Sequence, residues 1–379
     1  MNFQPYPFER LKNLTASIIP KKQGLTLTIG EPQFQTPLLI QDELKDYAYE
    51  LRYYPKSDGE DYLKNAQLHF IKNRFGISLK STQIIPTFGT REVLFNFPQF
   101  LLFDTPEPTI AHPNPFYQIY EGAAIASRAK TIYMNLEKAN DFKPILNSEE
   151  KKQVNLVILN SPNNPTGATL SMDELKLWVK WALEYDFVLL NDECYSEIYQ
   201  STPPISILQA SYESGNQEFK NILALNSISK RSSAPGLRSG FIAGDENILK
   251  NYRRYRSYIG CAIPNPLQRA SAKAWGDFCL SEDIRKKYAK NLQIAQKIFP
   301  QTFISPYTFY LWLEVTEDID FTQKLYEEEG ILVLPGSFLG REGIGKGYVR
   351  IALVYEENIL KPALKTISNF LNSYLKGKQ

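Results

Sequence analysis

Cysteine and histidine are scarce in this chain of 379 residues. The three cysteines are Cys194, Cys261 and Cys279, and none of them forms a Cys-x-x-Cys pair. Their number and spacing rule against a disulfide framework or a zinc ribbon and are typical of a reducing cytosol, so we expect a cytoplasmic protein. The two histidines, His69 and His112, lack metal-ligand spacing, which disfavours a metal site or a Ser-His-Asp triad.

The chain also lacks a large net charge and long apolar runs. Its 43 basic and 41 acidic residues give a formal net charge of +2, so no bulk field attracts nucleic acid or a membrane surface. No apolar run approaches the about 20 residues of a membrane-spanning helix. The first residues do not have the basic and then apolar pattern of a signal peptide. We therefore expect no nucleic-acid partner and no membrane association.

One local basic run, Arg253-Arg-Tyr-Arg256, is an exception to this balance. In a chain whose charges cancel, such a run is more typical of a solvated helix face or an interface patch than of a nucleic-acid site. The hydrophobic fraction of 43% and the charged fraction of 22% predict a large globular core. The length predicts two domains, or one large domain with an appendage.

Buried strands and helices alternate through most of the chain. Val154–Leu159, Phe187–Leu190 and Ile222–Asn226 are short apolar runs of the kind found in parallel sheets. Helical patterns separate these runs, and one helix follows a capping box made by Ser171 and Glu174. This alternation predicts an α/β fold in which helices flank a mostly parallel sheet.

The pattern changes beyond about residue 300. Phe309–Val315 and Tyr348–Val354 alternate in polarity and predict half-exposed antiparallel strands. Near the N-terminus, Leu25–Ile29 alternates in the same way and predicts a strand that leads into a turn. We expect a second, smaller α+β domain built from the C-terminal part and the N-terminal arm. The predicted division is an N-terminal arm with a small-domain segment (1–36), a large cofactor-binding domain (37–275) and a small C-terminal domain (276–379).

Candidate chemistry gathers in Ser227–Gly240, which follows the apolar run at Ile222–Asn226. Lys230 comes soon after that run, where side chains reach the crevice at the carboxyl end of an open α/β sheet. Partial desolvation there lowers the pKa of a lysine and makes it a nucleophile. A lysine considered alone would more commonly lie in a polar surface loop, so other residues must decide between the two interpretations.

Other strand ends carry polar side chains as well. Asp192 and Tyr195 follow one predicted strand, and Asn164 follows another. A carboxylate buried at such a position needs a cationic partner, because an isolated buried charge is very unfavourable. The ring nitrogen of a phosphorylated cofactor is one partner that would satisfy Asp192.

An anion site is predicted beside these residues. Gly89-Thr-Arg91 opens a helix, and the free N–H groups at a helix N-terminus bind anions. A cationic side chain and several hydroxyl groups can add hydrogen bonds to the same anion. These groups belong to Arg238, Thr90, Ser227 and Ser229. Together they predict a phosphate-binding cup close to the candidate amine.

The motifs resemble those of the pyridoxal-phosphate-dependent aminotransferases of classes I and II, which have fold type I. The matching stretches are Gly30-Glu-Pro32, Asn163-Asn-Pro-Thr-Gly167, Asp192-x-x-Tyr195, Ser227-x-Ser-Lys230 with Arg238, and Tyr348-Val-Arg350. The resemblance covers nearly the whole chain. It implies a seven-stranded, mostly parallel sheet, pyridoxal 5′-phosphate as the cofactor, and a homodimer with shared active sites.

The resemblance also implies a role for each residue around the cofactor ring. Lys230 resembles the lysine that bonds to the cofactor and, once released, moves a proton of the substrate. Asp192 resembles the carboxylate that pairs with the pyridine nitrogen. Tyr195 and Asn164 resemble the pair that hydrogen-bonds the ring hydroxyl group, and Tyr117 resembles the aromatic residue that stacks on the ring.

Further residues resemble those that bind the phosphate and the substrate. The phosphate cup of the family matches Gly89, Thr90, Arg91, Ser227, Ser229 and Arg238. Tyr54 matches a tyrosine that reaches the phosphate from the neighbouring subunit. Arg350 resembles the arginine that clamps the α-carboxylate of the substrate, and Gly30 and Asn164 belong to the same substrate-binding set.

The implied activity is ping-pong transfer of an amino group from an amino acid, with glutamate as the expected donor, to a 2-oxo acid. Ser257–Pro266 and the overall pattern are most similar to N-succinyldiaminopimelate aminotransferases of lysine biosynthesis, whose acceptor is N-succinyl-2-amino-6-oxopimelate. Aspartate, alanine or aromatic aminotransferases, or a carbon–sulfur lyase on the same fold, are alternatives. A non-catalytic ligand sensor with this fold is an alternative of another class, although it should have lost Lys230.

Overall fold

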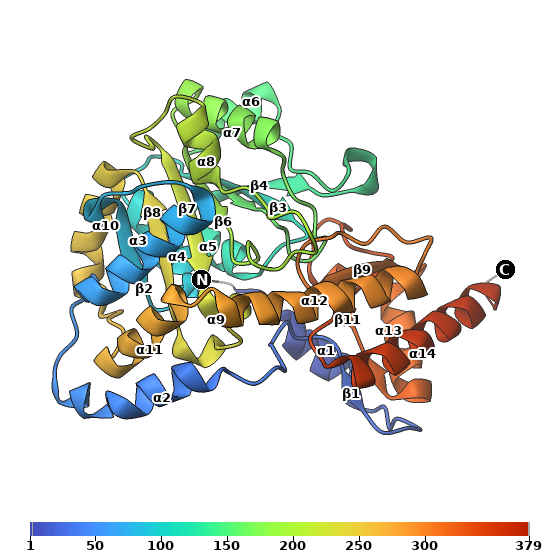
Figure 1. Cartoon of the computed structure of the whole chain (residues 1–379). Helices are drawn as coiled ribbons and strands as arrows, with labels where there is room; N and C mark the ends of the chain where they lie inside the picture. The colour runs from blue at the N-terminus through green and yellow to red at the C-terminus, as the bar shows by residue number, and fades with distance from the viewer. Residues whose placement is uncertain (2, 378–379) are drawn as a thin grey trace.

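A seven-stranded sheet dominates the computed structural model, which describes residue 1 and residues 3–377, and it confirms the predicted α/β fold. In spatial order the strands are β2 (Ile84–Thr87), β8 (Gly240–Gly244), β7 (Ile222–Ser227), β6 (Val188–Asp192), β5 (Leu156–Asn160), β3 (Thr109–Asn114) and β4 (Lys130–Asn135). Strand β8 runs antiparallel to β2 and β7, whereas the other neighbours pair in parallel. Figure 1 shows the strands of this sheet surrounded by helices.

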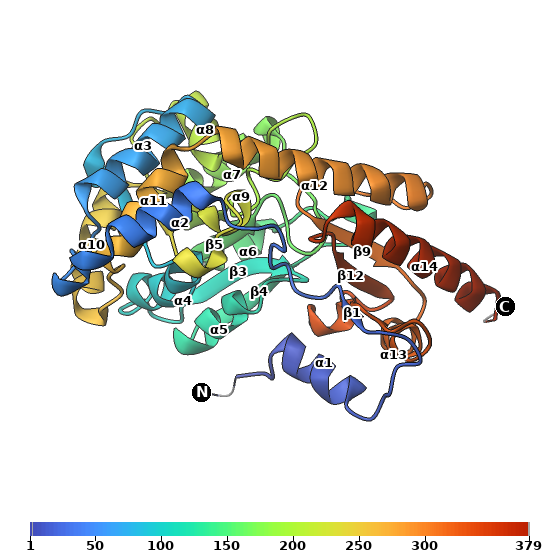
Figure 2. The same ribbon diagram turned by 60° about the horizontal axis from the view of Figure 1, so that its bottom comes forward.

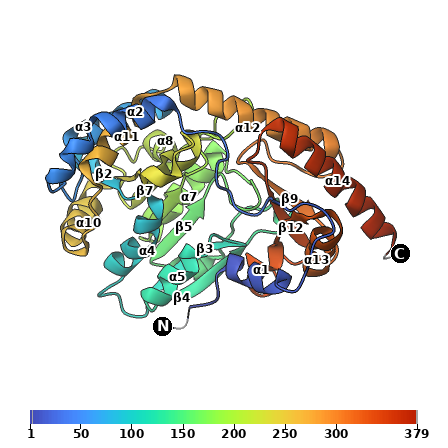
Figure 3. The same cartoon turned by 90° about the horizontal axis from the view of Figure 1, so that it is seen from below.

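Helices cover both faces of the large sheet, and Figure 3 separates α3 and α11 on one side from α4 and α5 on the other. The helices of the first face include α3 (Asp61–Phe75), α7 (Met172–Glu184) and α11 (Asn265–Gly276), and those of the second include α4 (Thr90–Leu101), α5 (Ile119–Ala126) and α10 (Glu246–Ile259). In β5, Val157 packs into the first cluster and Ile158 into the second. Because both faces are buried, the strand is apolar at successive positions.

The smaller part of the molecule holds a three-stranded antiparallel sheet, and Figure 1 shows α12 running along it from the large sheet. Its strands are β11 (Leu334–Pro335), β12 (Tyr348–Ala352) and β9 (Tyr310–Glu314), with α12 (Cys279–Ile298), α13 (Asp318–Glu329) and α14 (Glu357–Lys376) around them. The predicted half-exposure of these strands is wrong, because Leu311 and Ile351 pack with α12 and α14, and Trp312 packs with α1 (Pro7–Thr15) on the other face.

The N-terminal segment follows the small sheet, and Figure 2 shows α1 and β1 beside β12 and α13. Strand β1 (Leu25–Thr26) pairs in parallel with β10 (Ile331–Leu332). The predicted strand at 25–29 ends early because the carbonyl groups of Thr28 and Gly30 accept hydrogen bonds from the side chains of Arg350 and Lys230 instead of from a neighbouring strand.

The remaining helices are short connections. They are α2 (Leu38–Asp46), α6 (Ser148–Gln153), α8 (Ile207–Glu213) and α9 (Ile228–Arg231), with 3₁₀ turns at Ala48–Arg52, Ser81–Gln83, Lys138–Asn140, Pro235–Leu237 and Gly336–Phe338. Leu27 and Phe34 pack in one hydrophobic cluster with α12 and α14. The boundaries at residues 36 and 275 stay a prediction. Among the helices of the described residues, none has the combined length and apolarity that a membrane crossing requires.

Candidate active site

The carboxyl ends of three neighbouring parallel strands border a cavity of about 910 Å³. Asn160, Asp192 and Ser227 are the last residues of β5, β6 and β7, and all three line this cavity. It is also lined by most residues that the sequence pointed to: Gly30, Thr90, Arg91, Tyr117, Asn164, Tyr195, Ser229, Lys230, Arg238 and Arg350. Residues far apart in the chain therefore meet where an open α/β sheet binds its ligands.

Lys230 lies in α9, immediately after β7. Its Nζ donates a hydrogen bond to the carbonyl oxygen of Gly30 and lies 5.6 Å from the centre of the Phe309 ring. Burial lowers the pKa of Lys230 to about 8, and the positive charges of Arg350 and Arg238 act in the same direction. A large fraction of this amine is therefore neutral in mildly alkaline solution, which is the form that attacks a carbonyl carbon.

Asp192 presents a buried carboxylate to the same cavity. The Tyr120 hydroxyl donates to Asp192 Oδ2 at 2.8 Å, and the backbone N–H of Cys194 donates to Oδ1 at 3.2 Å. Burial raises the pKa of Asp192, and no Lys or Arg of the described residues forms an ion pair with it. Because a buried carboxylate is stabilised mainly by a cation, this position fits a positively charged atom of a ligand.

Arg350 enters the cavity from β12 with its guanidinium group buried. Nη1 donates to Asn164 Oδ1 at 2.8 Å and Nη2 donates to the Thr28 carbonyl oxygen at 2.6 Å, while Cζ lies 4.3 Å from the centre of the Tyr310 ring. The buried Nε has no hydrogen-bond partner within the described part of the chain. The alternating pattern of this strand would by itself suggest that the Arg350 side chain is exposed to solvent. The structure shows that it is buried.

Donors for an anion meet at the start of α4. Gly89 has φ of 72°, a left-handed backbone conformation that favours glycine, and Arg238 Nη2 lies only 2.2 Å from the position that a Cβ atom would take there. Ser227 Oγ donates to Ser229 Oγ at 2.9 Å and accepts from the Ser229 N–H at 3.1 Å. Thr90 is the first residue of α4 and therefore brings a helix N-terminus to the same place.

Arg91 belongs to the predicted cup by sequence, but its side chain turns toward other partners. Nε donates to the Tyr117 hydroxyl at 2.7 Å, and Nη2 donates to the Tyr6 hydroxyl at 3.4 Å. Tyr54 is not among the residues that line the cavity, and its side chain is 99% exposed. Any role of Tyr54 in this site would therefore need a second subunit.

Sequence reasoning missed several residues that complete the site. Tyr120 lies three positions after Tyr117, a helical spacing that could have found it, and Asn160 is a strand end like Asp192. Tyr310, whose hydroxyl is hydrogen-bonded to Tyr195 at 3.2 Å, carries no local signal. Cys194 also lines the cavity, and its Sγ lies 3.2 Å from Thr90 Oγ1.

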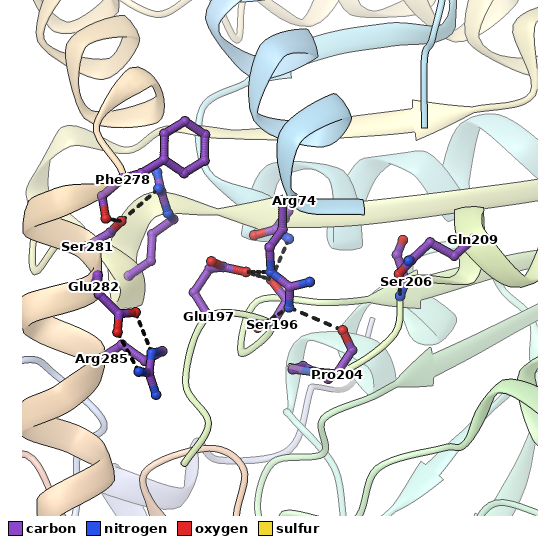
Figure 4. Close-up of polar contacts among 12 residues, drawn as sticks. Arg74, Ser196, Glu197, Pro204, Ser206, Gln209, Phe278, Ser281, Glu282 and Arg285 are labelled. Carbon is purple, nitrogen blue, oxygen red and sulfur yellow. Dashed lines mark hydrogen bonds and ion pairs between the residues drawn. The ribbon is translucent and has the colours of Figure 1, made fainter. Parts of the chain in front are cut away.

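Two arginines outside the cavity hold the loop that carries Tyr195. Figure 4 shows Arg74 with its partners in that loop and Arg285 with Glu282 of its own helix. Arg74 of α3 binds Glu197 Oε1 at 2.8 Å and the carbonyl oxygens of Ser196 and Pro204 at 3.1 and 3.2 Å. Arg285 of α12 donates to the carbonyl oxygens of residues 199 and 200 at 2.9 and 2.7 Å. Helices from both parts of the molecule thus fix the loop after β6.

The chemistry of these groups fits pyridoxal 5′-phosphate. Lys230 supplies an amine for its aldehyde, and Asp192 supplies a carboxylate that lacks a cation for its ring nitrogen. Its phosphate would find hydrogen-bond donors at Gly89 and the N-terminus of α4, and a positive charge at Arg238. The residues that face the cavity therefore match each polar end of the cofactor.

Comparisons with known proteins agree with this fit. The family model of aminotransferase class I and II matches residues 22–367. The structure is similar to that of the aminotransferase AspB from Helicobacter pylori, with 56% identity, a TM-score of 0.97 and coverage of 98% of this chain and 100% of that one. An aminotransferase from Neisseria meningitidis is 38% identical, with a TM-score of 0.93 and 98% of both chains covered.

A curated LL-diaminopimelate aminotransferase from Natranaerobius thermophilus is 30% identical over 387 residues, which cover 98% of this chain and 98% of that protein. The similarity therefore extends over both parts of the molecule and includes every strand end that lines the cavity. The chain belongs to the class I and II aminotransferases, a family of enzymes that depend on pyridoxal phosphate.

Proposed function

We propose that this enzyme transfers the amino group of glutamate to a 2-oxo acid by ping-pong exchange. The observation that carries the proposal is the pair formed by Lys230 and Asp192 across one cavity. One is an amine whose pKa burial lowers to about 8, and the other is a buried carboxylate to which the described residues supply no cation. Arg350 supports the proposal that the substrate carries an α-carboxylate. Its guanidinium group keeps a buried Nε that has no hydrogen-bond partner among the described residues.

The side chains divide the chemistry among them. When bound, pyridoxal 5′-phosphate supplies a carbonyl carbon that condenses with amines and a ring that accepts the electrons left when the substrate Cα loses its proton. Lys230 Nζ would hold that carbonyl carbon before the substrate arrives and would afterwards take the proton from Cα. Asp192 would keep a proton on the ring nitrogen, and Tyr195 and Asn164 would hydrogen-bond the ring hydroxyl group. Arg350 orients the substrate through its α-carboxylate.

For the acceptor we propose N-succinyl-2-amino-6-oxopimelate. The resemblance of Ser257–Pro266 supports this choice, and so does the similarity to a protein named for diaminopimelate, an acid with the same seven-carbon backbone. The cavity of about 910 Å³ supports an acceptor longer than pyruvate or oxaloacetate. Aspartate, alanine and aromatic aminotransferases and a carbon–sulfur lyase are the rival activities that a substrate screen must separate.

The screen uses the two half-reactions, which change the absorbance of the bound cofactor. We expect glutamate to convert the cofactor to its amino form, and the succinylated oxo acid to reverse that change faster than pyruvate, oxaloacetate or phenylpyruvate. Cystathionine tests the rival carbon–sulfur lyase activity, and we expect the enzyme to release no thiol from it. If no amino acid changes the spectrum of the holoenzyme, the proposed function is contradicted. A preference for another oxo acid would overturn only the proposed acceptor.

We also propose a homodimer with shared active sites, in a reducing cytoplasm that keeps the three free cysteines unpaired. Tyr54 is 99% exposed, and large apolar side chains of α2 and of the turn at Ala48–Arg52, among them Leu38 and Leu51, are exposed as well. Several exposed apolar side chains in one segment are the kind of residue that an interface buries, and they support the proposed dimer. In the proposed dimer, Tyr54 donates a hydrogen bond to the cofactor phosphate of the partner subunit.

Tyr54→Phe removes only this hydroxyl, so we expect the holoenzyme to lose cofactor about 10- to 100-fold more readily on dialysis, as for a hydrogen bond to a charged group. Lys230→Ala removes activity from its own site only. Mixing the two variants creates dimers in which one site has both residues intact, so about one quarter of the sites should recover activity. The comparison is made at a limiting concentration of cofactor. If the mixture is then no more active than the two separate variants, the active sites are not shared.

A further inference from the structure

We propose that a second cavity, which lies between the N-terminal arm and the loop from Ser337 to Lys346, binds the phosphate group of a small ligand. This cavity has a volume of about 510 Å³ and shares no lining residue with the active-site cavity. Arg10 of α1 lines it from the arm, and Arg341 and Lys346 line it from the loop. The inference goes beyond the proposed function, because neither the cofactor nor the proposed substrates need this cavity.

Arg10 carries a positive charge that the protein does not pair. Its Cζ lies 4.0 Å from the centre of the Phe338 ring, so the guanidinium group packs on an aromatic face. Among the described residues, its side chain forms no ion pair and no hydrogen bond. Burial lowers the pKa of Arg10, and the charge of Arg341 acts in the same direction, while that of Asp318 opposes it. A half-buried cation that a second cation repels is stabilised when an anion binds it.

Two acidic groups near this cavity are bound to other partners. Glu121 accepts hydrogen bonds from Arg341 Nε at 2.7 Å and from Nη2 at 2.5 Å, so this pair is already neutral. Asp318 is buried, and its carboxylate accepts from the backbone N–H groups of Ser337 at 2.9 Å and Gly347 at 3.4 Å. Neither carboxylate is therefore placed to pair with Arg10.

Glu342 is the carboxylate that lines the cavity itself. Its charge raises the pKa of Tyr133, whereas the charges that act on Arg10 are those of Arg341 and Asp318. Lys346 is exposed and forms no ion pair within the described part of the chain. Arg10 and Lys346 thus remain, one on each wall of the cavity, to meet the two negative charges of a phosphate group.

The arrangement fits a phosphate better than a carboxylate. The oxygens of a phosphate point in several directions and can bind cations on two walls, whereas a carboxylate pairs best with one planar fork. At Gly343, no heavy atom other than those of its chain neighbours lies within 4 Å of the position that a Cβ atom would take, so the described residues leave its backbone open to a ligand. The loop is not a P-loop, because Gly347 follows Lys346 and a strand follows the loop.

The N-terminal arm connects this cavity with the active site. Tyr6 directly precedes α1, and with Phe8 of that helix it lines the active-site cavity, while Arg10 lines the second one. A phosphate that binds both Arg10 and Lys346 joins α1 to the loop. The ligand would therefore hold one wall of the active site in place without entering it, as an effector does.

The test titrates the holoenzyme, whose cofactor fills the phosphate cup of the active site, with inorganic phosphate and with methyl phosphate in a calorimeter. We expect one phosphate to bind per chain. Arg10→Gln should weaken binding about 10- to 100-fold, as for hydrogen bonds to a charged group, and Lys346→Gln should weaken it less, because a lysine binds as a flexible point charge. Lys12→Gln is the matched control, since Lys12 is exposed on α1 and lines neither cavity. Tighter binding of methyl phosphate supports an organic phosphate as the ligand, and binding of inorganic phosphate alone supports free phosphate.

Arg350→Leu separates the second cavity from the active site. We expect this variant to bind phosphate as the wild type does, and a loss of binding would place the anion in the active-site cavity and overturn the inference. No binding to the wild type, or equal binding by Arg10→Gln and the wild type, would overturn it as well.

Cleavage of the arm by chymotrypsin provides a second measurement, because the arm carries the aromatic residues Phe3 and Phe8. Phosphate should slow this cleavage in the wild type and not in Arg10→Gln, and sodium chloride of equal ionic strength should not slow it. Equal protection of both proteins would contradict the proposed role of Arg10. If Arg10→Gln alters the glutamate half-reaction in phosphate-free buffer, α1 has moved, and Arg10→Lys, which keeps the charge but not the planar fork, takes its place with an expected intermediate loss of binding.

Discussion

Lys230→Ala should lower the rate of transamination by about 10⁴-fold or more, the largest effect expected of any single change in this protein. In the proposed mechanism, the substitution removes both the amine that holds the cofactor carbonyl and the base that moves the substrate proton. The absorbance of the covalently held cofactor should also disappear in the substrate-free protein. Both results can be measured on the same sample, by single-turnover kinetics with glutamate and by its absorbance spectrum.

A matched control separates this effect from loss of a surface charge. Lys130 is an exposed lysine that binds Glu107 at 2.9 Å, and Lys130→Ala should leave turnover unchanged because surface ion pairs contribute little to stability. A second measurement follows from the pKa of about 8 for Lys230. The rate at which cofactor-free protein recombines with added cofactor should rise with pH and level off above about pH 8, because only the neutral amine reacts. Turnover by Lys230→Ala would refute the assignment of the active site.

Asp192→Asn should reduce the rate of the glutamate half-reaction by about 10²- to 10⁴-fold. The carboxylate is buried and, in the proposed mechanism, stabilises a positive charge on the cofactor ring. Removing one partner of such a buried pair costs about 3 to 5 kcal/mol. Asparagine has nearly the same shape, and its oxygen can still accept from the Tyr120 hydroxyl. The expected loss of rate therefore reports the missing negative charge of Asp192 and not a change in packing.

Glu193→Gln is the control for this substitution. Glu193 is the next residue and is equally buried, but its carboxylate accepts hydrogen bonds from Asn191, Ser206 and the N–H of Ile207 and does not line the cavity. We expect the half-reaction rate of Glu193→Gln to stay within about 3-fold of wild type, since a glutamine oxygen can keep those donors. An Asp192→Asn enzyme as fast as this control would show that the carboxylate does not support the cofactor ring.

Local patterns predicted most of the large sheet. The runs at Val154–Leu159 and Ile222–Asn226 became β5 and β7, because strands covered by helices on both faces must be apolar throughout. Ser171 caps α7 with Glu174, as the spacing predicted, because a capping box depends on residues only three positions apart. Lys230 and Asp192 could be placed at one edge of the sheet because parallel strands bring their carboxyl ends together.

Local patterns could not predict the contacts between segments that are far apart in the sequence. The alternation in β12 did not show whether the face that carries Arg350 is covered. On that face Trp312 packs with Leu11 of α1, and the Thr28 carbonyl oxygen accepts a hydrogen bond from the buried guanidinium group of Arg350. Arg256, expected on a solvated helix face or in an interface patch, is 1% exposed and paired with Glu92. The period of a strand or helix shows which residues share a face but not what covers that face, so burial was decided only by the packing of remote elements.

The sequence by itself determined the α/β alternation, the capped helices and the strand ends that carry the polar side chains, because these depend on residues close together in the chain. Only the tertiary structure decided that Tyr120 supports Asp192, that Tyr310 meets Tyr195, and that Arg91 turns to Tyr117. The direction of a long side chain is set by whichever partner the fold brings within hydrogen-bonding distance, and that partner can lie anywhere in the sequence.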